Sequence, residues 1–191
     1  ALTGLSLPLA PDAMQLVVRL QARIRGASAR SSHRKRSQIA RELLLTEQSF
    51  YQGLQQIITV YLRPLTKLSN AGHEASLSGA DRRTIFSEVE ALAVLHHTQL
   101  LSGLMERMER WCMSSVVGDL FSVVTIESLK IHTVWANNYF SALAALKRAK
   151  EENPSFRAWV FQQQQRAGAG AANAGQAGAR LGLALEDYLI M

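Results

Sequence analysis

The sequence predicts an all-α protein, and three observations support that prediction. Helix-forming residues (Ala, Leu, Gln, Glu, Arg and Lys) fill most of the long segments. Runs of β-branched residues are short, at 57–60 and 116–117, so there is little from which strands could be built. Apolar residues make up 48% of the 191-residue chain and recur at helical spacing, which indicates a folded domain with its own core.

Positive charge is concentrated near the N-terminus. Residues 13–41 contain eight Arg or Lys residues and no acid, whereas the rest of the chain holds the other 13 of 21 bases and all 15 acids. A segment with this charge can meet an acidic protein, an acidic lipid surface or a nucleic acid. We therefore divide the chain into an N-terminal segment, 1–33, and a helical domain, 34–191.

The first two predicted helices follow each other directly along the sequence. Pro11-Asp12 is a typical helix entry, and residues 13–30 have the pattern of a basic amphipathic helix. Ser31-Ser32 predicts a break or a second cap before a long helix over 34–67. Pro64 falls in the last turns of that helix and is expected to kink or end it. The apolar stripe of the long helix comprises Ile39, Leu43, Phe50, Leu54, Ile57, Tyr61 and Leu65.

The remaining elements follow from periodicity, caps and helix breakers. Asn153-Pro154 is expected to end one helix, because the residue before proline is pushed out of the α region. Ser155 is the expected cap of the next helix. Residues 167–179 contain only Gly, Ala, Asn and Gln, and are predicted to be a disordered loop. Further helices are expected at 81–111, 114–123 and 126–152, with a last one beginning near 181.

Two acids on the long helix have different surroundings. At about 100° per residue, Glu42 lies outside the apolar arc beside Ser49, with Thr46 one turn further on. Glu47 falls near the middle of the arc, where an unpaired charge would be costly. From the pattern alone, Glu42 is either a solvated surface acid or a contact for a partner protein. Glu47 is expected to meet a charge or hydrogen-bond donors, inside the domain or on a partner.

Nine sequence blocks share one order and spacing with a known family. They are RELLLTEQSF at 41–50, VYLRPL at 60–65, IFSEVE at 85–90, LH at 95–96, VGDLF at 117–121, IH at 131–132, ANNY at 136–139, NPSFR at 153–157 and LEDYLIM at 185–191. Together they resemble the Dbl-homology domains, the exchange factors for Rho-family small GTPases. The first two blocks resemble the first conserved region of that family, and the last block resembles the opening of its third.

The resemblance implies an elongated helical bundle that binds the two switch loops of a small GTPase and promotes GDP release, with no covalent chemistry and no cofactor. Glu42 matches the switch-contacting glutamate of the family, and Thr46 and Ser49 are further switch-binding candidates. Glu47 is expected to be mainly structural, with a secondary switch contact left open. The family's other contact residues lie beyond the last residue given, Met191, so we expect residues 1–191 alone to show little exchange activity.

A second resemblance lies in the basic helix. The spacing of LQARIRGASAR at 20–30 resembles an IQ motif, the helix type bound by calmodulin and calmodulin-like light chains. It offers an apolar ridge, a glutamine that can donate and accept hydrogen bonds, a glycine that permits close approach, and arginines for an acidic partner. The candidate residues are Leu20, Gln21, Ile24, Arg25, Gly26 and Arg30. A basic helix that packs on its own domain or lies on an acidic membrane surface remains an alternative.

Other kinds of site have little support. No aromatic residues are interleaved with the N-terminal bases, so nucleic acid is not an expected partner. Cys112 is the one cysteine, so no internal disulfide or thiolate metal cluster can form, and a cytoplasmic protein is expected, with membrane recruitment left open. The histidines have no partners at metal-ligand spacing. The alternative to an exchange factor is a non-catalytic helical scaffold that binds calmodulin or acidic membrane through its basic helix.

Overall fold

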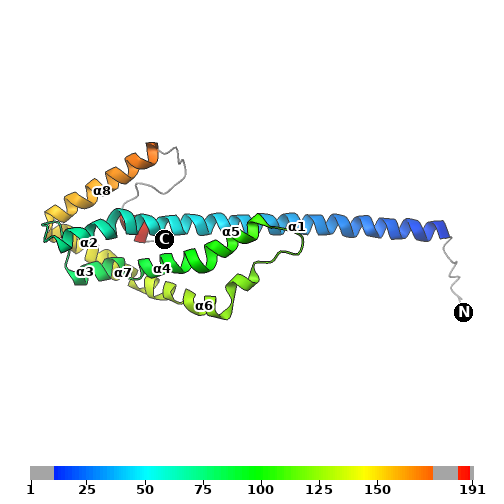
Figure 1. The fold of residues 1–191 in the computed structure, drawn as a ribbon, viewed down its shortest axis with the longest axis horizontal. Coiled ribbons are helices and arrows are strands. Elements are labelled where there is room, and N and C mark those ends of the chain that lie inside the picture. The colour runs from blue at the N-terminus through cyan, green and yellow to red at the C-terminus, as the bar shows by residue number, and fades with distance from the viewer. Residues whose placement is uncertain (1–10, 174–184, 190–191) are drawn as a thin grey trace, which may run out of the picture.

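The computed structural model describes residues 11–173 and 185–189, and every regular element among them is helical (Figure 1). The prediction of an all-α fold is confirmed. In order, the elements are α1 (Pro11–Gln56), the π-helical η1 (Ile57–Leu62), α2 (Arg63–Asn70), α3 (Gly79–Phe86), α4 (Val89–Leu95), the π-helical η2 (His96–Leu101), α5 (Ser102–Glu109), the 3-10 turn η3 (Gly118–Phe121), α6 (Val123–Leu129), α7 (Ile131–Glu152), α8 (Pro154–Asn173) and α9 (Leu185–Leu189). Within these ranges, no helix is long and apolar enough to cross a membrane.

Helix α1 is one rod of 46 residues. Residues 11–35, which we call the arm, project beyond the bundle (Figure 1). At 1.5 Å per residue the arm is roughly 37 Å long. The break expected at Ser31-Ser32 is absent. Charged helix formers follow both serines, and neither glycine nor proline takes the chain out of the helix at that point.

Pro64 does not end the helical path. The path continues through η1 and α2 to Asn70 and turns only at Ala71 and Gly72. The φ of Gly72 is +65°. Pro64 has no N–H to donate to the carbonyl four residues earlier, and its ring crowds that carbonyl. The π-helical segment lies directly before it, where the Arg63 N–H donates to Ile58 O, five residues back. The wider turn accommodates the proline within a continuous helix.

The helix expected over 81–111 is interrupted at Ser87, whose φ is +32°. The interruption separates α3 from α4, and the Ser87 N–H donates to Arg83 O at 2.8 Å. The adjacent residues Ile85 and Phe86 are both buried, as is Val89 after the turn. Neighbouring side chains on one helix point about 100° apart, so a change of direction after Phe86 lets all three enter one core.

The corner between α7 and α8 is formed as expected at Asn153-Pro154, but its cap is different. The Asn153 side chain, not Ser155, accepts a hydrogen bond from the Phe156 N–H at 2.9 Å, and Pro154 occupies the first helical position. Helix α8 then continues to Asn173. Residues 167–173, expected to be part of a disordered loop, are therefore helical, and the remainder of that predicted loop, 174–179, lies outside the described residues.

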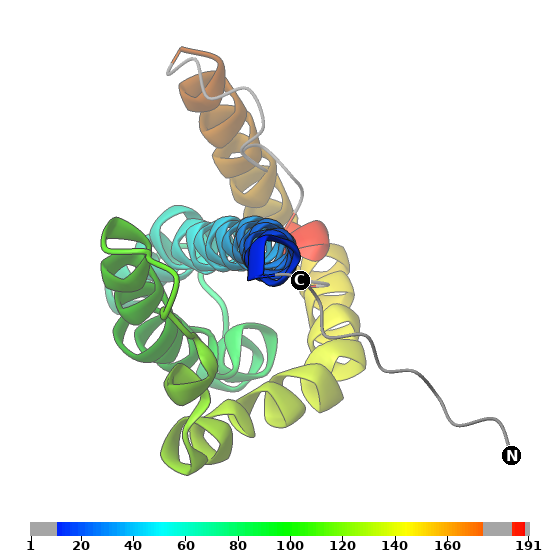
Figure 2. The same ribbon diagram turned by 90° about the vertical axis from the view of Figure 1, so that its right-hand side faces the viewer.

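The core lies where the end of α1, η1, α2, α3, α4, α7, α8 and α9 meet. Viewed along α1, helices α4 and α5 lie on one side of it and α7 on the other, with α6 below (Figure 2). Helix α9 is held by Leu185, which is buried, and by an ion pair between Glu186 and Lys150 of α7. The largest fully buried side chains are Tyr61, Phe156, Leu54, Ile57, Leu65, Ile85, Leu92, Leu104, Leu146, Leu185 and Val89.

Candidate functional site

The side of α1 just past the arm carries the predicted switch-binding residues. Glu42, Thr46 and Ser49 are all exposed. Thr46 and Ser49 lie within about 40° of Glu42 around the helix axis, so the three share one face. The Glu42 carboxylate accepts one hydrogen bond, from Gln38 Nε2 at 3.3 Å, and it forms no ion pair with the described residues. Its charge is therefore available to an external partner.

Two large apolar side chains flank this acid. Ile39 and Leu45 are each 64% exposed, and each lies about 60° from Glu42 around the helix. The sequence placed Ile39 in the buried stripe, and that prediction was wrong for this residue. The buried stripe is occupied only from Ala40 onwards, where α1 enters the bundle. We call the surface formed by Ile39, Glu42, Leu45, Thr46 and Ser49 the acidic face of α1.

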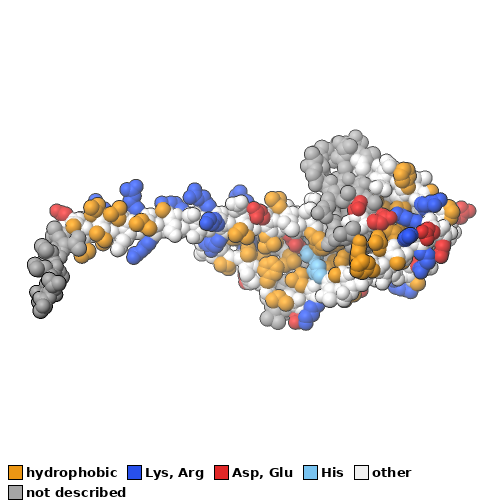
Figure 3. All heavy atoms as spheres, turned by 180° about the vertical axis from the view of Figure 1, so that it is seen from behind, with side chains coloured by type: hydrophobic (Ala, Val, Ile, Leu, Met, Phe, Trp, Pro, Cys, Tyr) orange, Lys and Arg blue, Asp and Glu red, His pale blue; other side chains and the backbone are white. Residues whose placement is uncertain are grey.

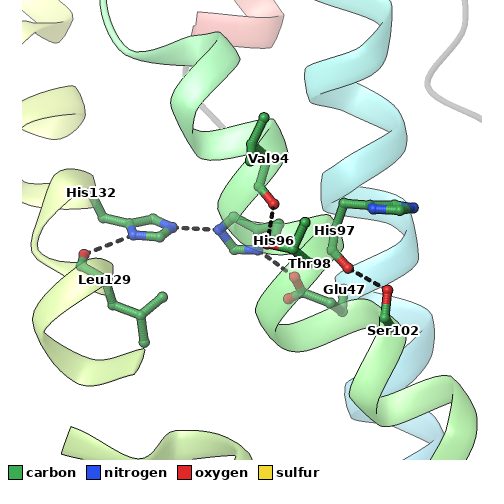
Figure 4. A network of polar contacts seen from close by, with 8 residues as sticks. All are labelled: Glu47, Val94, His96, His97, Thr98, Ser102, Leu129 and His132. Atoms are coloured by element: carbon green, nitrogen blue, oxygen red, sulfur yellow. Dashed lines mark hydrogen bonds and ion pairs between the residues drawn. The ribbon is translucent and has the colours of Figure 1, made fainter. Parts of the chain in front are cut away.

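On the opposite side of the same turns, α1 is held by a buried chain of polar contacts that runs from Glu47 through His96 to His132 (Figure 4). Glu47 is 9% exposed, and its Oε1 contacts Nδ1 of His96 in η2. His96 Nε2 lies 2.6 Å from His132 Nε2 in α7, and His132 Nδ1 lies 2.8 Å from the carbonyl oxygen of Leu129 in α6. The chain thus connects α1, η2, α6 and α7. The internal partner that the sequence led us to expect for Glu47 is His96.

The three contacts constrain where protons lie. The Leu129 carbonyl can only accept, so His132 Nδ1 must donate to it. Which nitrogen donates in the other two contacts depends on the tautomers of His96 and His132.

The distance between His96 and His132 is too short for two nitrogens that share one zinc ion. Two imidazole nitrogens bound to one zinc ion at about 2.0 Å each would lie roughly 3.3 Å apart at a tetrahedral angle, further than the 2.6 Å between His96 and His132. Within the residues that the structure describes, no group of three or more His, Cys, Asp or Glu side chains could hold a metal ion.

Aromatic packing supports the polar chain. The ring of Phe50 lies 4.5 Å from that of His96 and 6.2 Å from that of His132, measured between centroids. On the neighbouring side, Tyr51 lies 5.1 Å from the ring of His97. Because Glu47, Phe50 and Tyr51 come from the turns that present Thr46 and Ser49, these contacts fix the rotation of α1 about its axis. They therefore determine which side chains the acidic face presents.

The candidate calmodulin-binding residues lie along the arm. Their surroundings are open: Leu20 is 49% exposed and Ile24 is 67% exposed, and Gln21, Arg25 and Arg30 are exposed as well. Figure 3 shows basic side chains distributed along this projecting part of the molecule. Gly26 is half-buried because the Arg30 guanidinium folds over it; a Cβ at position 26 would lie 3.2 Å from Arg30 Nη1.

Arg36 is the first residue of α1 with a described hydrogen bond to a distant loop. Its guanidinium donates to Met113 O at 2.5 Å and to Ser115 O at 3.4 Å. In that loop the Cys112 thiol is exposed, and hydrogen bonds from the Ser114 and Ser115 hydroxyls lower its pKa to about 7. A thiol with this pKa is partly ionised at neutral pH.

Two features of the site were not found by sequence reasoning. Leu45 was not singled out, although its position outside the apolar arc could have marked it as an exposed apolar residue beside an acid. The contact of His96 with Glu47 and His132 was also missed. The signal was present, because His96 falls on the apolar face of its helix and a buried imidazole needs hydrogen-bond partners. Its partners lie 49 and 36 residues away, and sequence spacing could not identify them.

The comparisons with known proteins agree on one family. A family model described as the RhoGEF domain matches residues 39–191. Rho guanine nucleotide exchange factor osg-1 of Caenorhabditis elegans is 33% identical over 130 residues, which is 66% of this chain and 11% of that protein. Guanine exchange factor for Rac 30 of Dictyostelium discoideum is 29% identical over 142 residues, 71% of this chain and 8% of that protein.

A human protein, FYVE, RhoGEF and PH domain-containing protein 4, is 27% identical over 135 residues, 71% of this chain and 17% of its own length. The chain therefore spans only a small part of each of these relatives, and the match begins within α1, four residues after the arm.

Proposed function

The chain belongs to the RhoGEF domain family, and on that basis we propose that it binds the switch loops of a Rho-family small GTPase through the acidic face of α1 and promotes release of GDP. The observation that carries the proposal is the state of Glu42. It is an exposed carboxylate with no ion pair among the described residues, flanked by two exposed apolar side chains. A protein interface commonly combines such an apolar contact with a charged group that accepts hydrogen bonds.

The proposed mechanism needs no covalent step. An exchange factor acts by binding the nucleotide-free conformation of its GTPase more tightly than the GDP-bound conformation, so that GDP and magnesium are released. Glu42 would accept hydrogen bonds from switch-loop hydroxyls and backbone amides, with Thr46 and Ser49 as further polar contacts. The Glu47–His96–His132 chain would hold these groups in position from the opposite side of α1, without touching the GTPase.

Binding to nucleotide-free GTPase tests the proposal directly. With residues 1–191 and a panel of Rho-family GTPases stripped of nucleotide, we expect at least one GTPase to bind, and more tightly than its GDP form. Glu42→Ala should weaken that binding by roughly 1.5–3 kcal/mol, the range for a hydrogen bond to a charged group. Release of fluorescent GDP from the GTPase that binds is the second readout.

Glu152→Ala is the matched control, because Glu152 is also an exposed helical acid but lies at the far end of α7. It should leave binding unchanged. Equal losses in both variants, or no preference for the nucleotide-free form in any GTPase tested, would contradict the proposal and favour the non-catalytic scaffold.

We further propose that the arm binds calmodulin or a calmodulin-like light chain. The supporting observation is that Leu20 and Ile24 are exposed on a helix that also carries a dense series of bases. An amphipathic basic helix with an uncovered apolar ridge suits a groove in an acidic partner. The same features would also suit an acidic membrane surface, which the test below separates.

Fluorescence titration with calmodulin, with and without calcium, tests this second role. Ile24→Ala should weaken binding, whereas Val18→Ala should not, because Val18 lies about 120° away from the ridge and is similarly exposed. No binding in either calcium state would remove the calmodulin proposal. Binding of the arm to anionic vesicles in its place would support the membrane alternative.

A further inference from the structure

An open hollow of about 510 Å³ lies between α2 and α3. These two helices lie at the end of the bundle opposite the arm (Figure 1). Its lining includes four cationic side chains: Arg63 and Lys67 from α2, and Arg82 and Arg83 from α3. Leu62 and the buried Phe86 supply its apolar part. We call this hollow the basic pocket. Its volume lies within the range of small-molecule sites.

The four cations of the basic pocket are not paired with acids among the described residues. None of them forms an ion pair or a side-chain hydrogen bond with the described residues. Asp81, the nearest acid on α3, is paired with Arg148 of α7 and accepts a hydrogen bond from Ser78. The one acid in the lining is Glu90, which forms no ion pair with the described residues.

The basic pocket brings like charges close together. Arg63 and Lys67 are four residues apart on one helix, a spacing at which like charges repel. Arg82 and Arg83 are adjacent, and Arg82 is partly buried, so its guanidinium is partly withdrawn from water. The packing of α2 and α3 against the core does not require four cations around one hollow. A bound anion would relieve the repulsion.

We propose that the basic pocket binds a compact small molecule carrying two or more phosphate groups. Four cations and one carboxylate leave a net charge of +3. A phosphate monoester carries about −1.5 to −2 at neutral pH, so one phosphate leaves a surplus of positive charge and two come close to balancing it. Three of the four cations are arginines, whose planar guanidinium groups bind phosphate oxygens in pairs.

Neutral donors and the pocket's shape agree with this ligand class. The Ser87 hydroxyl lies in the lining and has no partner among the described residues, so it can donate to a phosphate oxygen. The patch formed by Leu62 and Phe86 can pack against a ring or chain that carries the phosphates. The ligand could be soluble or could be the headgroup of a membrane lipid, since both present the same phosphate groups.

The site is separate from the acidic face of α1, so this inference does not depend on the proposed exchange function. Isothermal titration of residues 1–191 with inositol hexakisphosphate at about 0.15 M salt tests it, because that salt screens diffuse attraction to the arm. We expect saturable binding of one molecule per chain. Glu42→Ala should leave this binding unchanged, so failure of one proposal is distinguishable from failure of the other.

The matched variants remove equal charge from two places. The pocket variant is Lys67→Gln/Arg82→Gln/Arg83→Gln, and the arm variant is Arg19→Gln/Arg34→Gln/Lys35→Gln, which removes one lysine and two arginines from exposed positions. The pocket variant should weaken binding by at least about tenfold, since several charge-assisted hydrogen bonds are lost, and the arm variant by less than about threefold. If the triple pocket variant does not fold, Lys67→Gln/Arg83→Gln, which changes only exposed side chains, replaces it.

Equal weakening in the two variants, or no saturable binding by the wild-type chain, would overturn the proposal. Vesicles then identify the source of the ligand. Phosphatidylcholine vesicles with a phosphoinositide bisphosphate are compared with phosphatidylserine vesicles of equal charge. A pocket-variant defect specific to the phosphoinositide assigns a lipid headgroup, whereas binding of the soluble inositol phosphate without such a defect assigns a soluble ligand.

Discussion

The arm and the bundle half of α1 belong to one continuous helix but are stabilised differently. In the arm, Leu16, Leu20 and Ile24 are between 49% and 67% exposed, and among the described residues no hydrogen bond or ion pair to another element is made before Arg36. In the bundle half, Leu54 is 1% exposed and Glu47 is buried against His96. The arm therefore depends on helix propensity and on any partner it binds, whereas the bundle half depends on tertiary packing.

This difference separates the two proposed roles of α1. The acidic face lies where the helix is fixed by burial on its other side, as suits a surface that must present side chains in one orientation. The candidate calmodulin-binding side chains lie on exposed turns of the arm, as suits a helix that a partner must surround. Four predictions test whether the two halves behave independently.

The largest expected effect comes from the core. Leu54→Ala should destabilise the bundle by about 2–5 kcal/mol, because it removes a fully buried side chain and leaves a cavity. Ile24→Ala, in the arm, should change stability by no more than about 0.5 kcal/mol. Urea unfolding followed by tryptophan fluorescence measures both, since Trp135 and Trp159 pack against the core. Similar losses in the two variants would show that the arm is part of the cooperative unit.

The second effect tests the buried polar chain. His96→Ala removes the partner of Glu47 and leaves His132 Nε2 without its contact, so we expect a loss of about 1–3 kcal/mol, the cost of leaving buried polar groups unsatisfied. Glu42→Gln changes an exposed acid on the same helix and should cost no more than about 0.5 kcal/mol. The urea midpoints of the two variants measure this difference in stability. If His96→Ala left the urea midpoint unchanged, the Glu47–His96–His132 contacts would not be what holds α1 in place.

The third effect concerns the arm alone. Gly26→Ala should stabilise the arm helix by up to about 1 kcal/mol, because alanine has the higher helix propensity and the nearby Arg30 side chain is free to move aside. Far-ultraviolet circular dichroism should show more helix, while the unfolding midpoint of the bundle stays unchanged. A higher midpoint would contradict the independence of the two halves. The same variant should weaken calmodulin binding if close approach at Gly26 matters.

The smallest effect lies at the border of the two halves. The Cys112 pKa is lowered to about 7 by the Ser114 and Ser115 hydroxyls, so alkylation of this thiol should rise with pH and reach half its maximum rate near pH 7. Arg36→Ala removes the α1 contacts to the loop and should move that midpoint upward, toward the ordinary value of 9.0. Arg157→Ala, a change at an exposed arginine in α8, is the control. An unchanged midpoint in Arg36→Ala would show that the loop keeps its shape without α1.

Backbone restrictions and helical periodicity predicted the features of this protein that depend on residues near one another in the sequence. The end of α7 at Asn153-Pro154 follows from backbone restriction, and the different positions of Glu42 and Glu47 follow from helical periodicity. The sequence predictions were wrong where packing between distant segments determines the structure. Ile39 fits the apolar stripe but lies before the bundle covers α1, and the break at Ser87 allows Ile85, Phe86 and Val89 to share one core.

The sequence by itself determined that the chain is helical, that most of its net positive charge comes from the first quarter, and that one face of the long helix carries an available acid. These properties depend on residue type and on spacing along one helix. Only the tertiary structure decided that His96 and His132 meet at Glu47, and that four cations of α2 and α3 surround one hollow. Such groups are brought together by the packing of separate helices, and the spacing of residues within one helix does not specify that packing.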